Sequence, residues 1–93
     1  MRVVVLTVTL YVSWVHSLKE KRMEIKSLLQ RLCNKFNVSA CETSEQDMIQ
    51  TLVISVVSIA ANPSRADSIA DNILAFMEGS TEAEVTAIDR QIY

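Results

Sequence analysis

The segment that begins at Ser17 constrains the fold of this chain more than any other. Ser17 is a favourable N-cap residue, and Glu20 at the third helical position is placed to reach back to the Ser17 amide, which would complete a capping box. Apolar residues then recur at helical spacing and form one stripe, which consists of Leu18, Ile25, Leu28, Leu29, Leu32 and Phe36. No Gly or Pro interrupts the pattern before Asn37, and residues 38–43 predict a short strand. A helix that leads almost directly into a strand leaves few possible architectures.

Two longer segments predict the central strands of a sheet. Residues 2–12 alternate, with one wholly apolar face made of Val4, Leu6, Val8, Leu10 and Val12 and a second, mixed face. Residues 50–61 are apolar at both odd and even positions, so both faces of the strand would be apolar, which is typical of a strand in the middle of a sheet.

The rest of the chain predicts a second helix and a last strand. Pro63 suits the first turn of the helix, and Ser64 with Asp67 is expected to cap it. Its apolar stripe consists of Ala66, Ile69, Ala70, Ile73, Leu74 and Met77. Gly79 is expected to end the helix, and residues 84–93 predict a strand. Because the 93 residues contain one Gly and one Pro, we expect few and short loops.

The resulting order is strand, helix, strand, strand, helix, strand, which is typical of ferredoxin-like α+β domains. We therefore predict a βαββαβ sandwich, in which two helices cover one face of a four-stranded antiparallel sheet. Right-handed crossovers place both helices on that face, with the first and third strands at the centre. The length fits one domain spanning residues 1–93.

The opposite face of this sheet would be bare and rather apolar for a surface in water. We expect it to be covered by a second copy of the chain in a two-fold dimer. The residues expected at this interface are Thr7, Thr9, Tyr11, Val53 and Val57. The alternative is that Thr, Ser and long side chains cover the face adequately.

Composition and short sequence patterns limit the possible partners and the possible cellular location of the protein. A net charge of −2 gives no overall attraction to nucleic acid or to anionic membranes. The run 52–61 is too short to cross a bilayer, which needs about 20 apolar residues. Residues 3–12 alternate and no cleavage site follows them, so they do not resemble a signal peptide. Cys33 and Cys41 lack the spacing of metal ligands. We expect a cytoplasmic protein with reduced thiols and no membrane partner.

Several short motifs carry a resemblance to a known family. They are the run Ser-Leu-Lys-Glu-Lys-Arg at 17–22, Phe-Asn-Val-Ser at 36–39, Glu42, Gln46-Asp47 and Gln50. Because these motifs occur in the same order as in the bacterial YlxP-like family of unknown function, the chain resembles that family over essentially its whole length. The resemblance implies a ferredoxin-like fold. Because genes of the family often lie among translation genes, it also implies a link to RNA or the ribosome. The chain has Glu45 and Ile49 where the family pattern has His and Trp, so no role of those two residues is transferred.

The first helix carries an excess of positive charge. Its six basic residues, set against Glu20 and Glu24, give 6 − 2 = +4, so the remainder of the chain sums to −6. Such a helix can bind a phosphate backbone. Lys19, Arg22 and Lys26 lie close together by helical angle and are the first candidates. Lys21, Arg31 and Lys35 complete the candidate nucleic-acid-binding set. The alternative is a solvated helix face with intrahelical ion pairs, in which basic side chains lie along the apolar stripe.

No pattern in the sequence predicts catalysis. His16 is the single histidine and has no nucleophile or carboxylate beside it in sequence. Residues 12–18 contain no Gly, unlike the phosphate loop of acylphosphatases. Glu42, Glu45 and Asp47 lack further ligands for a metal ion. We therefore expect a non-enzymatic binding or accessory protein without a cofactor or metal. The leading hypothesis is association with RNA or the ribosome, and the alternative is a homo-oligomeric interaction module without a nucleic-acid partner.

Overall fold

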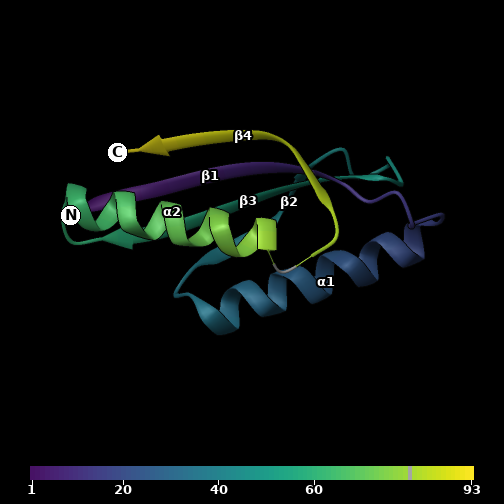
Figure 1. Ribbon diagram of the computed structural model, residues 1–93, viewed down its shortest axis with the longest axis horizontal. Helices are drawn as coiled ribbons and strands as arrows, with labels where there is room; N and C mark the ends of the chain where they lie inside the picture. Colours follow the sequence, from purple (N-terminus) through teal and green to yellow (C-terminus); the bar gives the residue numbers. More distant parts are fainter. Residues whose placement is uncertain (80) are drawn as a thin grey trace.

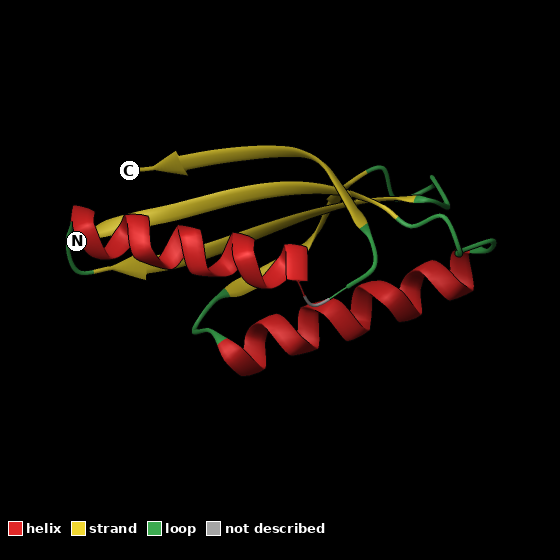
Figure 2. Cartoon of the chain, viewed as in Figure 1, coloured by secondary structure: helices red, strands yellow, loops and turns green. Residues whose placement is uncertain are grey.

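The computed structural model describes residues 1–79 and 81–93, which form two helices and four strands (Figures 1 and 2). In chain order they are β1 (Arg2–Tyr11), α1 (Leu18–Lys35), β2 (Ser39–Ser44), β3 (Thr51–Ala60), α2 (Pro63–Gly79) and β4 (Glu84–Ile92). All six elements occur where the sequence predicts them. None of the helices in the described residues is both long enough and apolar enough to span a membrane.

The strands form one antiparallel sheet in the order β2-β3-β1-β4, so β1 and β3 are central, as predicted. Both helices lie on one side of the sheet, and both termini lie at the same end of the molecule (Figure 1). The predicted ferredoxin-like fold is confirmed. Opposite the termini, the β1–α1 loop and the β2–β3 loop lie side by side, and this end of the molecule contains much of the polar structure described below.

The core lies between the sheet and the helices. The helix-facing residues of β1, which are Val4, Leu6, Val8 and Leu10, are fully buried. From α1 they meet Ile25, Leu28 and Leu32, and from α2 Ala66, Ala70, Ile73 and Met77. The two alanines let the α2 backbone approach the sheet closely. Full burial of a Val, Leu or Ile side chain contributes about 1.5–3 kcal/mol, so this layer supplies most of the driving force for folding.

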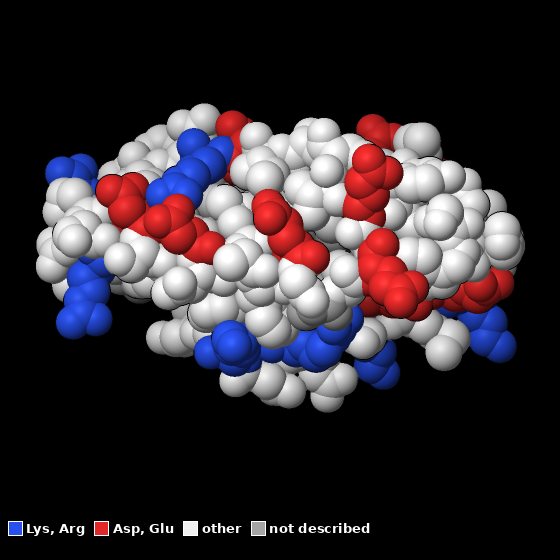
Figure 3. Space-filling model, viewed as in Figure 1, with Lys and Arg blue, Asp and Glu red and all other residues white. Residues whose placement is uncertain are grey.

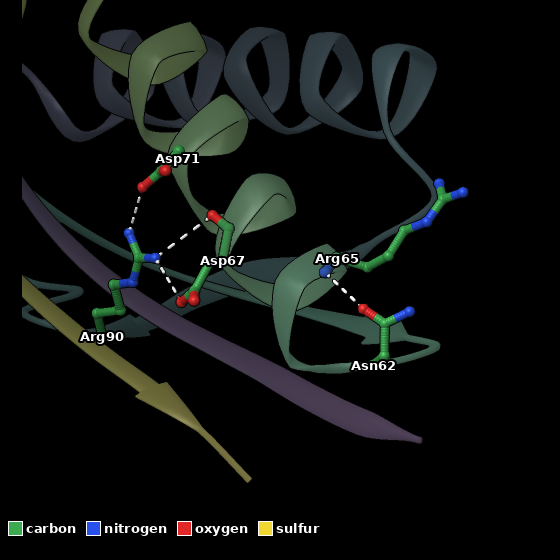
Figure 4. A network of polar contacts seen from close by, with 5 residues as sticks. All are labelled: Asn62, Arg65, Asp67, Asp71 and Arg90. Atoms are coloured by element: carbon green, nitrogen blue, oxygen red, sulfur yellow. Dashed lines mark hydrogen bonds and ion pairs between the residues drawn. The ribbon is translucent and has the colours of Figure 1, made fainter.

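The start of α2 differs from the prediction. Asn62, and not Ser64 with Asp67, caps the helix, because its Oδ1 accepts a hydrogen bond of 2.9 Å from the Arg65 backbone N–H (Figure 4). Pro63 is the first helical residue, which moves the cap to the residue before it. Asp67 instead lies 3.2 Å from Arg90 of β4, and Asp71 lies 2.7 Å from the same guanidinium. These ion pairs tie the edge strand β4 to α2.

The open face of the sheet is more polar in its middle than the sequence pattern implies. Ser55 of β3 hydrogen-bonds Thr7 of β1 at 3.1 Å and Thr43 of β2 at 2.7 Å through their hydroxyl groups. Of the residues predicted at a dimer interface, Val53 is buried with 8% of its surface exposed, whereas Val57 is 39% exposed. Thr7 and Thr9 are half-buried and Tyr11 is exposed. The face is therefore divided by a row of hydroxyl groups.

Candidate nucleic-acid interface

The beginning of α1 is set by Ser17. Its Oγ accepts a hydrogen bond of 3.1 Å from the Glu20 backbone N–H, which confirms the predicted N-cap. The second half of the predicted capping box takes another form, since the Ser17 hydroxyl itself donates to Glu20 Oε1 at 3.3 Å. Glu24 accepts a hydrogen bond of 3.1 Å from Trp14 Nε1. Both carboxylates of α1 thus bind residues at or before the start of the helix.

The two exposed flanks of α1 differ in their surroundings. Near its end, Lys35 lies over the Phe76 ring of α2 at 5.3 Å from the centroid, and the Phe36 ring meets Phe76 edge-on at 5.6 Å. Arg31 is half-buried on the same flank, and its Nε donates to the Ser27 carbonyl oxygen at 3.4 Å. This flank therefore faces α2, so Arg31 and Lys35 do not extend the predicted group of Lys19, Arg22 and Lys26.

Lys19, Arg22 and Lys26 lie on the opposite flank, which we call the basic flank. All three are exposed. At about 100° per residue they fall within about 60° of the helix circumference, on the side away from Glu20 and Glu24. Within residues 1–79 and 81–93, none of the three forms an ion pair. Figure 3 shows Lys and Arg side chains projecting along the margin formed by α1, while Asp and Glu lie over the middle of this face. The charge separation expected from the sequence is therefore present on the surface.

Lys21 does not belong to this surface, which corrects its assignment to the nucleic-acid-binding set. Its side chain is 1% exposed. The ammonium nitrogen donates to the carbonyl oxygens of Glu45 at 2.6 Å and Met48 at 2.5 Å, and lies 3.4 Å from that of Gln46. Glu42 Oε2 lies 3.0 Å away as an ion pair, although it accepts no hydrogen bond among the described residues. The attraction between the two side chains is therefore chiefly one of charge.

The sequence contained a signal for this burial. Lys21 falls on the apolar stripe, three residues after Leu18 and four before Ile25, and its neighbours on that face point into the core. A lysine at such a position must either extend along the stripe to water or find oxygen atoms inside. Here the β2–β3 loop supplies them, which sequence spacing alone could not reveal.

A second side chain joins the same two loops. Gln50 Nε2 donates to the carbonyl oxygens of Ser13 at 3.0 Å and Val15 at 3.1 Å. Together, Lys21 and Gln50 fix the β2–β3 loop against α1 and the β1–α1 loop. Between the loops lies an open depression of 440 Å³ lined by Val15, His16, Asp47, Met48, Ile49 and Gln50. His16, for which the sequence predicted no role, is part of its wall. No group of His, Cys, Asp and Glu in the described residues has the arrangement of a metal site.

Comparison with known proteins places the chain in a family. The family model described as "Protein of unknown function (DUF503)" matches residues 3–90. The chain belongs to this family. The DUF503 chain is also 36% identical, over 70 residues, to the uncharacterized protein YlxP of Bacillus subtilis strain 168, an alignment that covers 75% of this chain and 76% of that protein. The predicted YlxP-like membership is confirmed, and the family description supplies no activity for the basic flank or the depression.

The structure explains part of the motif that carries the family resemblance. Ser17 caps α1, and Lys21 pairs with Glu42 while it holds the backbone of Gln46 and its neighbours. Gln50 holds the other loop. In this DUF503 chain, much of the motif therefore builds one end of the domain, whereas Lys19 and Arg22 within it face solvent.

Proposed function

We propose that this DUF503 protein is a non-enzymatic, cytoplasmic accessory protein that binds RNA, free or in the ribosome, through the basic flank of α1. The observation that carries the proposal is that Lys19, Arg22 and Lys26 are exposed together, without an ion pair among the described residues and without a carboxylate on the same flank. Three such charges within two turns of one helix can each contact a phosphate of a nucleic-acid backbone.

The basic flank favours contact with the backbone of RNA and not with its bases. The basic flank carries no aromatic side chain on which a base could stack. The chain outside residues 17–36 sums to −6, which disfavours contact of a polyanion with much of the surface away from α1. Binding is therefore expected to be weak and strongly dependent on salt.

The test is a salt series of binding to single-stranded ribosomal RNA fragments. In the variant Lys19→Gln/Arg22→Gln/Lys26→Gln, the slope of log affinity against log salt concentration should shrink by about 2, since each phosphate contact on a single strand contributes about 0.7. The matched control is Arg2→Gln/Lys35→Gln/Arg65→Gln, which removes the same charge from exposed positions off the basic flank. The control should keep nearly the wild-type slope.

Two results would reject the proposal. Equal slopes for the two triple variants would mean that net charge, and not the basic flank, governs binding. Absence of binding by the wild-type protein at low salt would remove RNA as a partner altogether.

A second candidate function, homodimerisation, is favoured by one corner of the open sheet face. Ile59 is 67% exposed and Tyr93 is 66% exposed, and Val57 contributes a further apolar side chain. They are neighbours in the sheet, because Val3 pairs with Ile59 on one side and exchanges backbone hydrogen bonds with Tyr93 on the other. An isologous contact would bury this corner in both copies. Thr9 and Tyr11 lie on the other side of the hydroxyl row from this corner. The proposed interface is therefore centred elsewhere than the sequence suggested.

A further inference from the structure

The depression between the two loops has walls that are held in place before any ligand arrives. Gln50 fixes one wall through the carbonyls of Ser13 and Val15. Lys21, which is 1% exposed, fixes the other through the carbonyls of Glu45 and Met48. A surface loop of polar residues would ordinarily be mobile. Here a buried ammonium group and a carboxamide hold it, so binding would require little further ordering of the loops.

The lining of the depression combines apolar surface with a few polar groups. Met48 is 49% exposed and Ile49 is 38% exposed, and both line the depression beside Val15. His16, which has a flat imidazole ring, and Asp47, which has a carboxylate, are also among the lining residues. This combination is typical of small-ligand sites, in which apolar walls hold a planar group and a polar group orients it.

We propose that this depression receives one unpaired guanine base of the single-stranded RNA whose phosphates lie along the basic flank. The assignment therefore rests on the proposed function. The carboxylate of Asp47 only accepts hydrogen bonds. Guanine is the base whose Watson–Crick edge presents two adjacent donors, the ring N–H and the exocyclic amino group, so it matches a carboxylate best. Side chains of Met48, Ile49 and His16 would contact the faces of the ring.

The position of the depression agrees with this arrangement. His16 lies in the β1–α1 loop, three residues before Lys19, which is the first residue of the basic flank. A nucleotide whose base enters the depression would therefore have its phosphate near Lys19, and the strand would continue towards Arg22 and Lys26. The base contact would add a preference that the phosphate contacts cannot supply.

The first experiment measures binding of two nine-nucleotide RNAs, all uridine or uridine with one central guanosine. The wild-type protein should prefer the second by about fivefold, the lower end expected for a paired hydrogen-bond contact to a base. Asp47→Asn should remove the preference, because the amide offers one acceptor only. Glu45→Gln is the matched control: it removes the same charge from the same loop, and its backbone carbonyl remains available to Lys21. It should retain the preference.

A second experiment tests the depression without relying on the basic flank. In a ¹⁵N amide NMR titration with guanosine monophosphate, the amide signals of Asp47, Met48 and Ile49 should shift, and cytidine monophosphate should shift them less. Equal binding of the two RNAs by the wild-type protein, or a preference unchanged in Asp47→Asn, would overturn the guanine site while the salt series could still support the basic flank. Conversely, guanosine monophosphate shifts at these amides would support the site even if RNA binding proved insensitive to Lys19, Arg22 and Lys26. Shifts located elsewhere would overturn it.

Discussion

The ammonium nitrogen of Lys21 lies 3.0 Å from Glu42 Oε2, with 1% of the lysine side chain and 17% of the glutamate side chain exposed. Burial of an ammonium group is costly unless its charge is paired and its hydrogens are bonded. Lys21 meets both conditions, because the backbone carbonyls of Glu45 and Met48 accept two of its three hydrogens. Glu45 has a positive φ of 56°, so the loop adopts a tight conformation that presents these carbonyls inward.

Replacement of Lys21 by Met should therefore destabilise the domain strongly. The variant keeps most of the side-chain volume but leaves Glu42 and the loop carbonyls without their partner, and loss of one member of a buried pair costs about 3–5 kcal/mol. The free energy of unfolding from urea denaturation measures the effect. Lys26→Met, at an exposed position of the same helix, should change it by no more than about 0.5 kcal/mol. A similar small change for both variants would contradict the structural role of Lys21.

Leu32 tests the packing of α1 against the sheet. It is fully buried, so Leu32→Ala should lower the free energy of unfolding by about 2–5 kcal/mol through lost burial and an unfilled cavity. Met23→Ala is the control, since Met23 is 64% exposed on the same helix. Thermal and urea denaturation should rank the two variants far apart, and a loss below about 0.5 kcal/mol at Leu32 would mean that the core is misassigned.

Arg90 should stabilise the domain modestly. This stabilisation should depend on the salt concentration and should not change with pH near neutrality. The hydrogen bond to Asp71 raises the pKa of the Arg90 guanidinium. A raised pKa for a base means that the stabilisation is fully present below the unfolded-state pKa and is lost only as pH rises through the higher folded-state pKa, in strongly alkaline solution. Because the pair is partly exposed, Arg90→Gln should cost no more than about 1 kcal/mol at low salt.

The difference in the free energy of unfolding between wild type and Arg90→Gln should shrink in about 1 M salt, where charges are screened within about 3 Å. Urea denaturation at low and high salt measures it. A difference that does not change with salt would indicate that Arg90 acts through packing of its side chain against α2.

The apolar corner of the open face predicts the oligomeric state. If a second copy covers it, wild-type protein should dimerise as concentration rises, and Val57→Glu should remain folded but monomeric, because the contact would bury an unpaired charge. Sedimentation velocity at several concentrations is the measurement, with circular dichroism to check folding. Met23→Glu places the same charge on exposed apolar surface of α1 and should leave the dimer intact. Wild-type protein that stays monomeric up to high concentration would exclude this interface.

Much of the fold followed from local patterns. Alternation in β1 and the apolar character of both faces of β3 predicted two central strands, and the capped stripe of α1 predicted the helix. These patterns work because each element must bury one face, and the period of apolar residues shows which face that is. Lys19, Arg22 and Lys26 could be grouped in the same way, since helical geometry determines which residues share a flank.

What the sequence could not determine were contacts between residues far apart in the chain. The position of Lys21 on the apolar stripe distinguished it from its basic neighbours, but its partners could not be predicted, because they come from a loop 24 to 27 residues away. The division of the open face by Thr7, Ser55 and Thr43 likewise depends on the register of three strands. The sequence by itself determined the elements, their order and the charge of α1, since these depend on neighbours within a few turns. Only the tertiary structure decided which charges remain in water and which are buried, because that depends on the oxygen atoms brought near each side chain when distant segments pack together.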